Sequence, residues 1–383
     1  MKVIVSGDLC LSGEPEKLVL ATSDFDFWEG IDSLAGRDSV VVANVEFALT
    51  ARGQPKPYKW ATLRASPACV GALKRMQVAV VGNNHISDYG DVGAQDTVDC
   101  LADAGITTVG YGANLEAALR PAVVEQNGVR MAILSLSCPT TNGENLATHT
   151  SAGVAPLSPD LLRTSITDAR SRADALLVYL HWGVEQSHDP VPDQIRLAHR
   201  AVEWGADAVV GCHAHVIQSY ERYQGRWIFY GLGNFLFGPI DTLQLLPDGS
   251  HQRGRQEQAS VNRESLAIQF RIRPDSTEGR LELEAIHPLV FGRDYVPRPI
   301  ARDYLKADLD RANSRLMRYA ELHQQALRRN TDPVFRAIPS KGGKMGYFYG
   351  SEPIRDADVQ SPFRRHLRRL RRTFGRGLHL PGR

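Results

Sequence analysis

The sequence lacks any run of about 18 apolar residues, the length that a membrane-spanning helix requires, so no such helix is expected. Cysteine is scarce, with five residues among 383 and no close Cys-x-x-Cys pair. An odd number of scattered cysteines is typical of a chain in a reducing cytoplasm and argues against a disulfide framework. The apolar run after Met1 is too short for a signal-peptide core, because polar residues begin at Ser6. We therefore expect a cytoplasmic protein.

The sequence also lacks a strong overall charge. Lys and Arg number 45 and Asp and Glu 43, so the formal net charge is +2 and no specific nucleic-acid partner is expected. Residues 361–383 are the exception, with eight arginines and no acid. This tail could make a peripheral contact with anionic lipid at the inner face of the membrane, grip an anionic polymer or nucleic acid, or stay solvated.

Short β-branched runs alternate with amphipathic stretches from residue 1 to about 240, which predicts an α/β fold with mixed sheets. The expected strands are Lys2–Ser6, Ser39–Ala43, Val78–Val81, Thr107–Val109, Met131–Leu136, Ala175–Leu180, Ala208–Val210 and Trp227–Tyr230. The expected helices are Ala68–Arg75, Ala94–Ala104, Pro159–Arg172 and Asp193–Trp204.

Beyond residue 240 the pattern changes. Residues 240–262 are polar and predict a loop, whereas Ser265–Arg273 and Arg280–Pro288 alternate apolar and polar residues and predict an antiparallel hairpin. A helical pattern resumes over 299–329. We therefore divide the chain into a catalytic-type domain at 1–297 and a helical, Arg-rich extension at 298–383.

Polar side chains gather where the expected strands end. One such residue alone is more often a turn or a helix cap, but this coincidence recurs at six successive strands. In open α/β sheets ligands bind outside the carboxyl ends of the strands, so we expect these side chains to form one site. They lie in the segments Gly7-Asp8, Asn44-Val45-Glu46, Asn83-Asn84-His85, His181-Trp182-Gly183, Gly211-Cys212-His213-Ala214-His215 and Gly231-Leu232-Gly233-Asn234.

The residue types at these strand ends suit metal binding. Carboxylates, an amide and imidazoles are ligands for Mn, Fe or Zn, and a shared carboxylate can offset the repulsion between two cations. In a loop after a strand, the spacing of His213 and His215 lets the pair divide between neighbouring ions. We expect two divalent metal ions, held by Asp8, Glu46, Asn84, His181, His213 and His215.

The same segments resemble the CapA family of bacterial poly-γ-glutamate capsule biosynthesis proteins (the PGA_cap domain). The most specific segments are Asn83–Gly90, which reads NNHISDYG, and Gly233–Phe235, which reads GNF. The resemblance covers residues 1 to about 240 and extends to about 290 with the hairpin. The family is similar to the calcineurin-like metallophosphatases, which implies a four-layer α/β sandwich with a two-metal site.

The resemblance also implies roles for the site residues. Asp8 and His215 would bind the first metal, Asn84, His181 and His213 the second, and Glu46 would bridge them. His85 would protonate the leaving group, with Asp88 orienting it. Two positions depart from the metallophosphatase pattern: Cys10 stands where a histidine is usual, and Glu46 where an aspartate is usual. Further candidates for metal ligation or support of the ligands are Cys10, Asn44, Asn83, Glu185 and Asn234.

The expected activity is hydrolysis of a phosphoester by a metal-activated water, in the biosynthesis of a capsule or other surface polymer. Two alternatives stay open: a metal-dependent amide-bond enzyme, or an accessory subunit of the capsule synthesis machinery without phosphatase activity. Specificity should lie in Thr50–Arg64 and Cys138–His149, where Lys56, Lys59 and Arg64 suit an anionic small-molecule or polymer substrate.

Overall fold

The computed structural model describes residues 1–316 apart from 23–24, 58, 143–144, 246–250, 275, 277–279, 302–309 and 311–312, and in addition residues 338–339 and 345–346. Contacts divide the chain into two units, Met1–Leu316 and Met317–Arg383. In the second unit the described residues form one antiparallel pair, β21 (Ile338–Pro339) with β22 (Met345–Gly346). The proposed boundary at 297/298 stays a prediction, and the Arg-rich tail lies outside the described residues.

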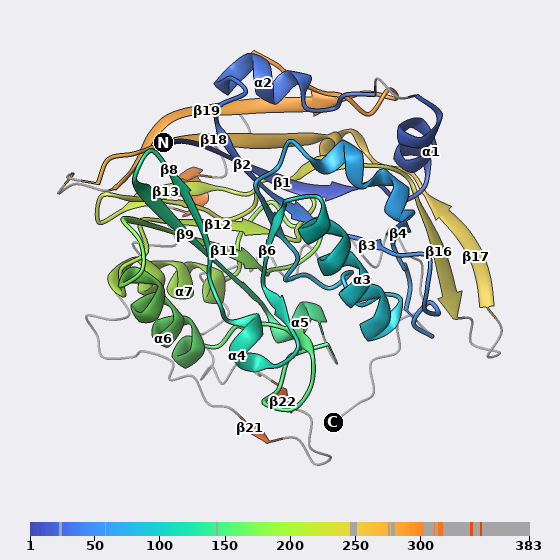
Figure 1. The fold of residues 1–383 in the computed structure, drawn as a ribbon, viewed down its shortest axis with the longest axis horizontal. Coiled ribbons are helices and arrows are strands. Elements are labelled where there is room, and N and C mark those ends of the chain that lie inside the picture. Colours follow the sequence, from blue (N-terminus) through green and yellow to red (C-terminus); the bar gives the residue numbers. More distant parts are fainter. Residues whose placement is uncertain are drawn as a thin grey trace, which may run out of the picture. The chain divides into compact units, whose positions relative to one another are not determined.

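Two mixed sheets form the centre of the first unit (Figure 1). The first has the order β20 (Pro297–Pro299), β19 (Leu281–Phe291), β18 (Glu264–Ile272), β1 (Lys2–Cys10), β2 (Val40–Val45), β5 (Val78–Val80), β6 (Thr107–Val109), with β15 (Asn234–Phe237) parallel to β1. The second has the order β13 (Tyr220–Tyr223), β14 (Arg226–Phe229), β12 (Ala208–Cys212), β11 (Ala175–His181), β9 (Val129–Ser137), β8 (Ala122–Gln126).

The alternation of side chains along β1 explains how the layers are held. Val3 and Val5 point to the second sheet, where they join a buried apolar cluster with Leu177 and Tyr179 of β11. Ile4, between them, belongs to a second cluster on the opposite face of the sheet. Burying such a side chain stabilises the fold by roughly 1.5–3 kcal/mol.

Helices cover both outer faces of the two sheets. On the first sheet Ile31 of α2 and Leu101 of α3 pack in the cluster that contains Ile4, and on the second α6 packs on β9 and β11 and α7 on β12. Figure 1 shows α2 outside the first sheet and α6 and α7 outside the second. The predicted four-layer α/β sandwich is therefore confirmed. The helical segments are α1 (Glu14–Ala21), α2 (Glu29–Ala35), η1 (Pro67–Leu73), α3 (Gly90–Asp103), α4 (Leu115–Ala118), α5 (Pro139–Asn142), α6 (Pro159–Arg170), α7 (Pro192–Glu203) and η2 (Ser260–Arg263).

The sequence of α6 shows why these helices form. Ser158 caps it by accepting a hydrogen bond from the Leu161 amide, and Pro159 occupies the first turn. Leu162, Ile166 and Ala169 are buried, a spacing of four and three residues that places them on one face. The helix predicted over Ala68–Arg75 is a 3-10 helix, η1, whose cap is Ser66.

The hairpin of β18 and β19 confirms the prediction for 265–288, and it joins the first sheet antiparallel to β1. The predicted loop over 240–262 was wrong for two segments that pair antiparallel, β16 (Ile240–Leu245) and β17 (His251–Gln256). β17 has no apolar side chain, and its pairing with β16 gives its backbone groups hydrogen-bond partners. Smaller pairs are β3 (Ala48–Leu49) with β4 (Arg64–Ala65) and β7 (Tyr111–Gly112) with β10 (Gly153–Val154).

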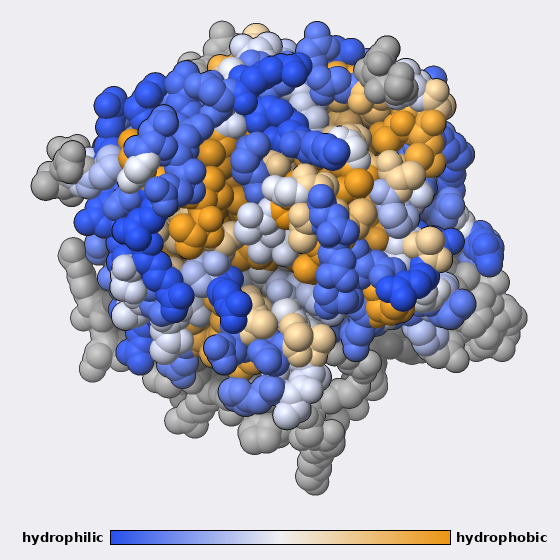
Figure 2. Space-filling model, viewed as in Figure 1, coloured by the Kyte–Doolittle hydropathy of each residue, from blue (hydrophilic) through white to orange (hydrophobic). Residues whose placement is uncertain are grey.

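Polar residues, in blue, cover most of the face of the molecule in Figure 2, and apolar residues, in orange, gather in several groups between them. Large exposed apolar side chains among the described residues include Leu20 and Trp60, the latter 46% exposed. In the part of the chain that the structure describes, no helix is long and apolar enough to cross a membrane.

Candidate metal centre

The register of three neighbouring strands determines which side chains meet at the centre. Asp8 of β1 lies beside Asn44 of β2 and Asn234 of β15, and both ladders are irregular next to Asp8. In the second sheet His181, the last residue of β11, pairs with Cys212 at the end of β12. The carboxyl ends of β1, β2, β11 and β12, together with the first residue of β15, therefore bring side chains from residue 8 to residue 234 to one place.

The predicted ligands form two groups of side chains that share Glu46. One group is Glu46, His181 and His213, the other Asp8, Glu46 and His215, and within each group the ligand atoms lie within 4.8 Å of one another. Glu46 Oε1 is 3.9 Å from His181 Nε2 and 3.7 Å from His215 Nε2. The Glu46 carboxylate thus lies between the histidines of the two groups.

The sixth predicted ligand, Asn84, belongs beside the first group. Its Oδ1 lies 2.9 Å from His181 Nε2. Two donor atoms that each lie about 2.1 Å from one ion at a right angle are about 3.0 Å apart, so the pair could bind one cation.

Two buried atoms of the centre test whether a metal ion fits. Among the described residues, Glu46 Oε1 and His213 Nδ1 have no hydrogen-bond partner and are buried. Leaving such an atom unpaired costs about 1–3 kcal/mol, so buried polar groups are nearly always paired. A carboxylate oxygen and an imidazole nitrogen are also natural ligands of Mn, Fe and Zn. The residues present therefore fit a pair of divalent cations.

Burial sets the protonation of these groups. It raises the pKa of Asp8, although His215 opposes the shift, and it raises the pKa of Glu46 well above its usual range, with the Asp8 carboxylate adding to the effect. Burial and then neighbouring imidazoles lower the pKa of His181 and of His213 well below the usual range. A bound cation would reverse the penalty on the two carboxylates.

Asn44 and Asn83 hold the carboxylates in place. The Asn44 side-chain amide donates to Asp8 Oδ1 at 2.9 Å and to Glu46 Oε2 at 3.2 Å. Asn83 donates to Asn44 Oδ1 at 3.0 Å, and its own Oδ1 accepts from the backbone of His85. Both residues were predicted near the site, and their contacts support the ligands rather than add to them.

The loop that carries His213 and His215 is in an uncommon backbone conformation. Both residues have positive φ, 91° and 56°, which costs a residue with a side chain about 1–3 kcal/mol where the surroundings impose it. Asn234 Oδ1 lies 2.9 Å from His215 Nδ1, while its amide donates to the Asn262 carbonyl. The structure thus places His213 in one group and His215 in the other, as the two-residue spacing in a loop allows.

Cys212 is a residue of the centre that sequence reasoning missed. Its Sγ lies 3.1 Å from His181 Nδ1, on the side of the ring away from Asn84. Burial raises the pKa of this thiol well above its usual range. The signal was present in the sequence, since Cys212 precedes His213 in one of the strand-end segments, but the thiol itself was not proposed as a partner of the histidines.

His85 and Asp88 lie beside the ligand groups as a hydrogen-bonded pair. His85 Nδ1 is 2.7 Å from Asp88 Oδ2. Burial acts to raise the pKa of Asp88, but His85 and Lys59 outweigh it and hold that pKa below its usual range. Burial lowers the pKa of His85, against the effect of Asp88. An ionised carboxylate only accepts, so His85 carries its proton on Nδ1 and leaves Nε2 for other partners.

The remaining predicted residues have varied surroundings. Cys10 is buried in the apolar cluster beside the helices, outside both ligand groups, and burial raises its pKa well above the usual range. Glu185 is exposed. Lys56 donates to Asn145 Oδ1, and the Arg64 guanidinium lies 4.7 Å from the centroid of the Tyr89 ring.

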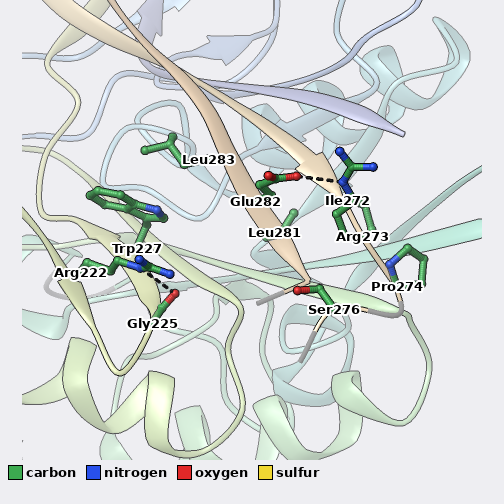
Figure 3. Close-up of a pocket in the computed structure, with 10 residues that line it drawn as sticks. All are labelled: Arg222, Gly225, Trp227, Ile272, Arg273, Pro274, Ser276, Leu281, Glu282 and Leu283. Atoms are coloured by element: carbon green, nitrogen blue, oxygen red, sulfur yellow. Dashed lines mark hydrogen bonds and ion pairs between the residues drawn. The ribbon is translucent and has the colours of Figure 1, made fainter. Parts of the chain in front are cut away.

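A hollow of about 740 Å³ lies away from this centre (Figure 3). Trp227 near the start of β14, Ile272 at the end of β18 and Leu281 at the start of β19 line it. Because β18 runs antiparallel to β1, these positions lie at the amino-terminal ends of β1 and β14. The ligand groups lie at the carboxyl ends, so this hollow is a separate feature.

Comparison with known proteins places the chain in a family. A family model described as bacterial capsule synthesis protein PGA_cap matches residues 2–239. The PGA biosynthesis protein CapA of Bacillus subtilis (strain 168) is 30% identical over 308 residues, which cover 78% of this chain and 74% of that protein. A probable polyglutamine synthesis accessory protein of Mycobacterium tuberculosis (strain ATCC 25618 / H37Rv) is 29% identical over 290 residues, covering 72% of this chain and 73% of that protein.

Among solved structures, a putative 5′-nucleotidase from Staphylococcus aureus in complex with alpha-ketoglutarate is similar with a TM-score of 0.47 and 13% identity, over 81% of this chain and 58% of that one. The family assignment rests on the sequence comparisons, in which the family model spans more than half of the chain. The segments that first indicated the family all lie inside the matched range, and the chain belongs to the bacterial capsule synthesis proteins of the PGA_cap family.

Proposed function

We propose that this chain is a metal-dependent hydrolase of the metallophosphatase type that acts on a phosphoester in the biosynthesis of a capsule or other surface polymer. One observation carries the proposal: two ligand groups share Glu46, whose Oε1 is buried and has no hydrogen-bond partner among the described residues. Such a carboxylate is suited to bridging two cations.

In this proposal Asp8 and His215 would hold one metal ion, Asn84, His181 and His213 would hold the other, and both groups would share Glu46. Two divalent cations of Mn, Fe or Zn would supply a water of lowered pKa and neutralise charge on the phosphoryl oxygens. Asn44 keeps both carboxylates aimed at the centre through its two hydrogen bonds. Cys212 and Asn234 do the same for the rings of His181 and His215.

His85 has the role of general acid. To act as the acid, the ring would carry a second proton on Nε2 while its Nδ1 proton is held by Asp88. Transfer of the Nε2 proton to the leaving oxygen would return the ring to the neutral form with its proton on Nδ1. The buried position of the pair excludes water from the Nδ1 side of the ring. We place the reaction in the cytoplasm, with the capsule synthesis machinery as the partner.

A second candidate function is an accessory role in polymer synthesis, or chemistry on an amide bond, without phosphatase activity. The mycobacterial relative favours it, because that protein is described as a probable accessory protein of polyglutamine synthesis. Glutamate polymers are joined by amides, and metals at the same centre could polarise an amide carbonyl.

The test combines metal analysis with activity assays on the full chain. The protein is reconstituted with Mn²⁺, its metal content is measured, and turnover of p-nitrophenyl phosphate and bis-p-nitrophenyl phosphate is followed. We expect close to two ions per chain and Mn-dependent turnover of at least one ester. Removal of a residue that supports a ligand lowers metal affinity or activity by about 10–100-fold. His215→Ala removes a proposed ligand and should therefore lower both metal affinity and activity by more than that.

His199→Ala is the matched control, because His199 binds Glu221 away from the centre. It should keep both metal and turnover. Fewer than half an ion per chain after reconstitution would overturn the two-metal centre. Full metal content with no turnover of either ester, in wild type and control alike, would favour the accessory or amide function.

A further inference from the structure

Lys59 directs its charge into the molecule. Its Nζ donates to the backbone carbonyl of Asn84 at 2.6 Å and forms an ion pair with Asp88 Oδ1. It also lies 3.3 Å from His85 Nδ1, but that nitrogen holds its proton toward Asp88 and cannot accept from an ammonium. The Lys59 side chain is 25% exposed and Asp88 is fully buried.

Asp88 joins the Thr50–Arg64 segment to the strand-end segment of Asn84 and His85. Its Oδ2 accepts from the Leu63 amide at 2.7 Å, and its backbone carbonyl accepts from the Lys56 amide at 2.8 Å. With the ion pair to Lys59, three residues of the segment contact Asp88, namely Lys56, Lys59 and Leu63. We call this set of contacts the junction. A buried carboxylate is costly unless it is paired, so the lysine is the counter-charge that this junction needs.

We propose that Lys59 is a positioning residue of the centre, and not a residue that binds the anionic part of a substrate. Its bond to the Asn84 carbonyl fixes the turn that aims the Asn84 side chain at His181. Its ion pair holds the Asp88 carboxylate that orients His85. The inference rests on the proposed function for its catalytic consequence, but the junction itself exists without metal or substrate.

The surroundings of Lys59 differ from those of Arg64, another basic residue of the segment. Arg64 is exposed and rests on the Tyr89 ring, so its charge faces solvent. The ammonium of Lys59 has two of its three protons engaged by Asn84 and Asp88. Trp60 lies between Lys59 and Leu63, the two residues whose Nζ and backbone amide contact the Asp88 side chain, and it is 46% exposed.

The experiment compares Lys59→Met and Lys59→Arg with the control Lys74→Met, which removes an exposed positive charge at the end of η1. Hydrogen exchange of the metal-free protein is measured over residues 50–64. Mn²⁺ affinity is measured by calorimetry, and kcat and KM on the ester that wild type turns over. We expect Lys59→Met to exchange the Leu63 amide at least about tenfold faster, to bind Mn²⁺ more weakly and to lose about 10–100-fold in kcat at nearly unchanged KM.

Lys59→Arg should restore a substantial part of each loss, and Lys74→Met should match wild type throughout. Unchanged exchange and Mn²⁺ affinity in Lys59→Met would overturn the proposal, and a rise in KM alone would assign Lys59 to the substrate. If wild type turns over no ester, the proposed function fails. The exchange measurement then still decides the junction, because faster exchange supports it and unchanged exchange refutes it.

Discussion

Replacing Glu46 with glutamine should stabilise the metal-free protein and remove its stabilisation by metal. The ligand oxygens of Glu46 and Asp8 lie within 4.8 Å of each other in a fully buried setting. Two ionised groups at that distance repel each other by about 3 kcal/mol at an effective dielectric constant of roughly 20. Protonation of either group limits this penalty, so we expect Glu46→Gln to raise the free energy of unfolding by about 1–3 kcal/mol in EDTA.

The assay is thermal unfolding in EDTA and in Mn²⁺. For a domain of this size 1 kcal/mol shifts Tm by about 2 °C, so the metal-free variant should unfold about 2–6 °C above wild type. With Mn²⁺ at a thousand times its Kd, wild type should gain about 4.1 kcal/mol and the order should reverse. Glu125→Gln, an exposed carboxylate on β8, is the control and should follow wild type.

The pH dependence has a defined sign. The pKa of Glu46 is higher in the folded protein than its ordinary value of about 4.3. Such a group stabilises the fold below its unfolded pKa, and that contribution is lost as pH rises through the folded value. In EDTA the advantage of Glu46→Gln should therefore grow with pH. The reasoning would be refuted if Glu46→Gln had a lower Tm than wild type in EDTA, or if Mn²⁺ raised its Tm as much as it raises that of wild type.

Two further predictions concern the framework of the site. Gly7→Ala should destabilise the protein by more than about 3 kcal/mol in urea unfolding, because a Cβ at Gly7 would lie 1.9 Å from the Gly233 carbonyl oxygen. Gly71→Ala is the control, since a Cβ there meets nothing within 4 Å, and equal losses would contradict the argument. The buried thiols are those of Cys10, Cys69 and Cys212, and burial raises the pKa of each, that of Cys69 to about 11. At pH 8 these thiols should react with Ellman's reagent only after the protein unfolds. Rapid reaction of the native protein at these positions would be inconsistent with the packing.

The strands and the ligand groups could be predicted because both follow from local patterns. Buried parallel strands are continuous apolar runs, and a polar residue directly after such a run must lie at the sheet edge. His181 and His213 are examples, as their strands end at His181 and Cys212. Their convergence needs only the rule that parallel strands share one carboxyl edge.

Other features depend on contacts that no local pattern carries. Lys59 was expected to face an anionic substrate, but its charge turns inward because Asp88, 29 positions later, is buried beside it. Cys10 lies two residues after Asp8 along a strand irregular at Asp8, and its thiol belongs to the apolar cluster. The pairing of β16 with β17 was not predicted because β17, which reads HQRGRQ, has no apolar residue to mark it as a strand.

The position of β1 has a consequence for how the protein is made. This first strand pairs with β2, but also with β15 and β18, which are synthesised more than 200 residues later. The nascent chain therefore exposes one edge of its central strand until β15 and β18 emerge, and such long-range pairing slows folding. Asp8 and Asn234 meet only at that stage. The contact of Asn234 Oδ1 with His215 Nδ1 can form only once β15 has emerged, so the orientation of the His215 ring should report a late step in the assembly of the first sheet.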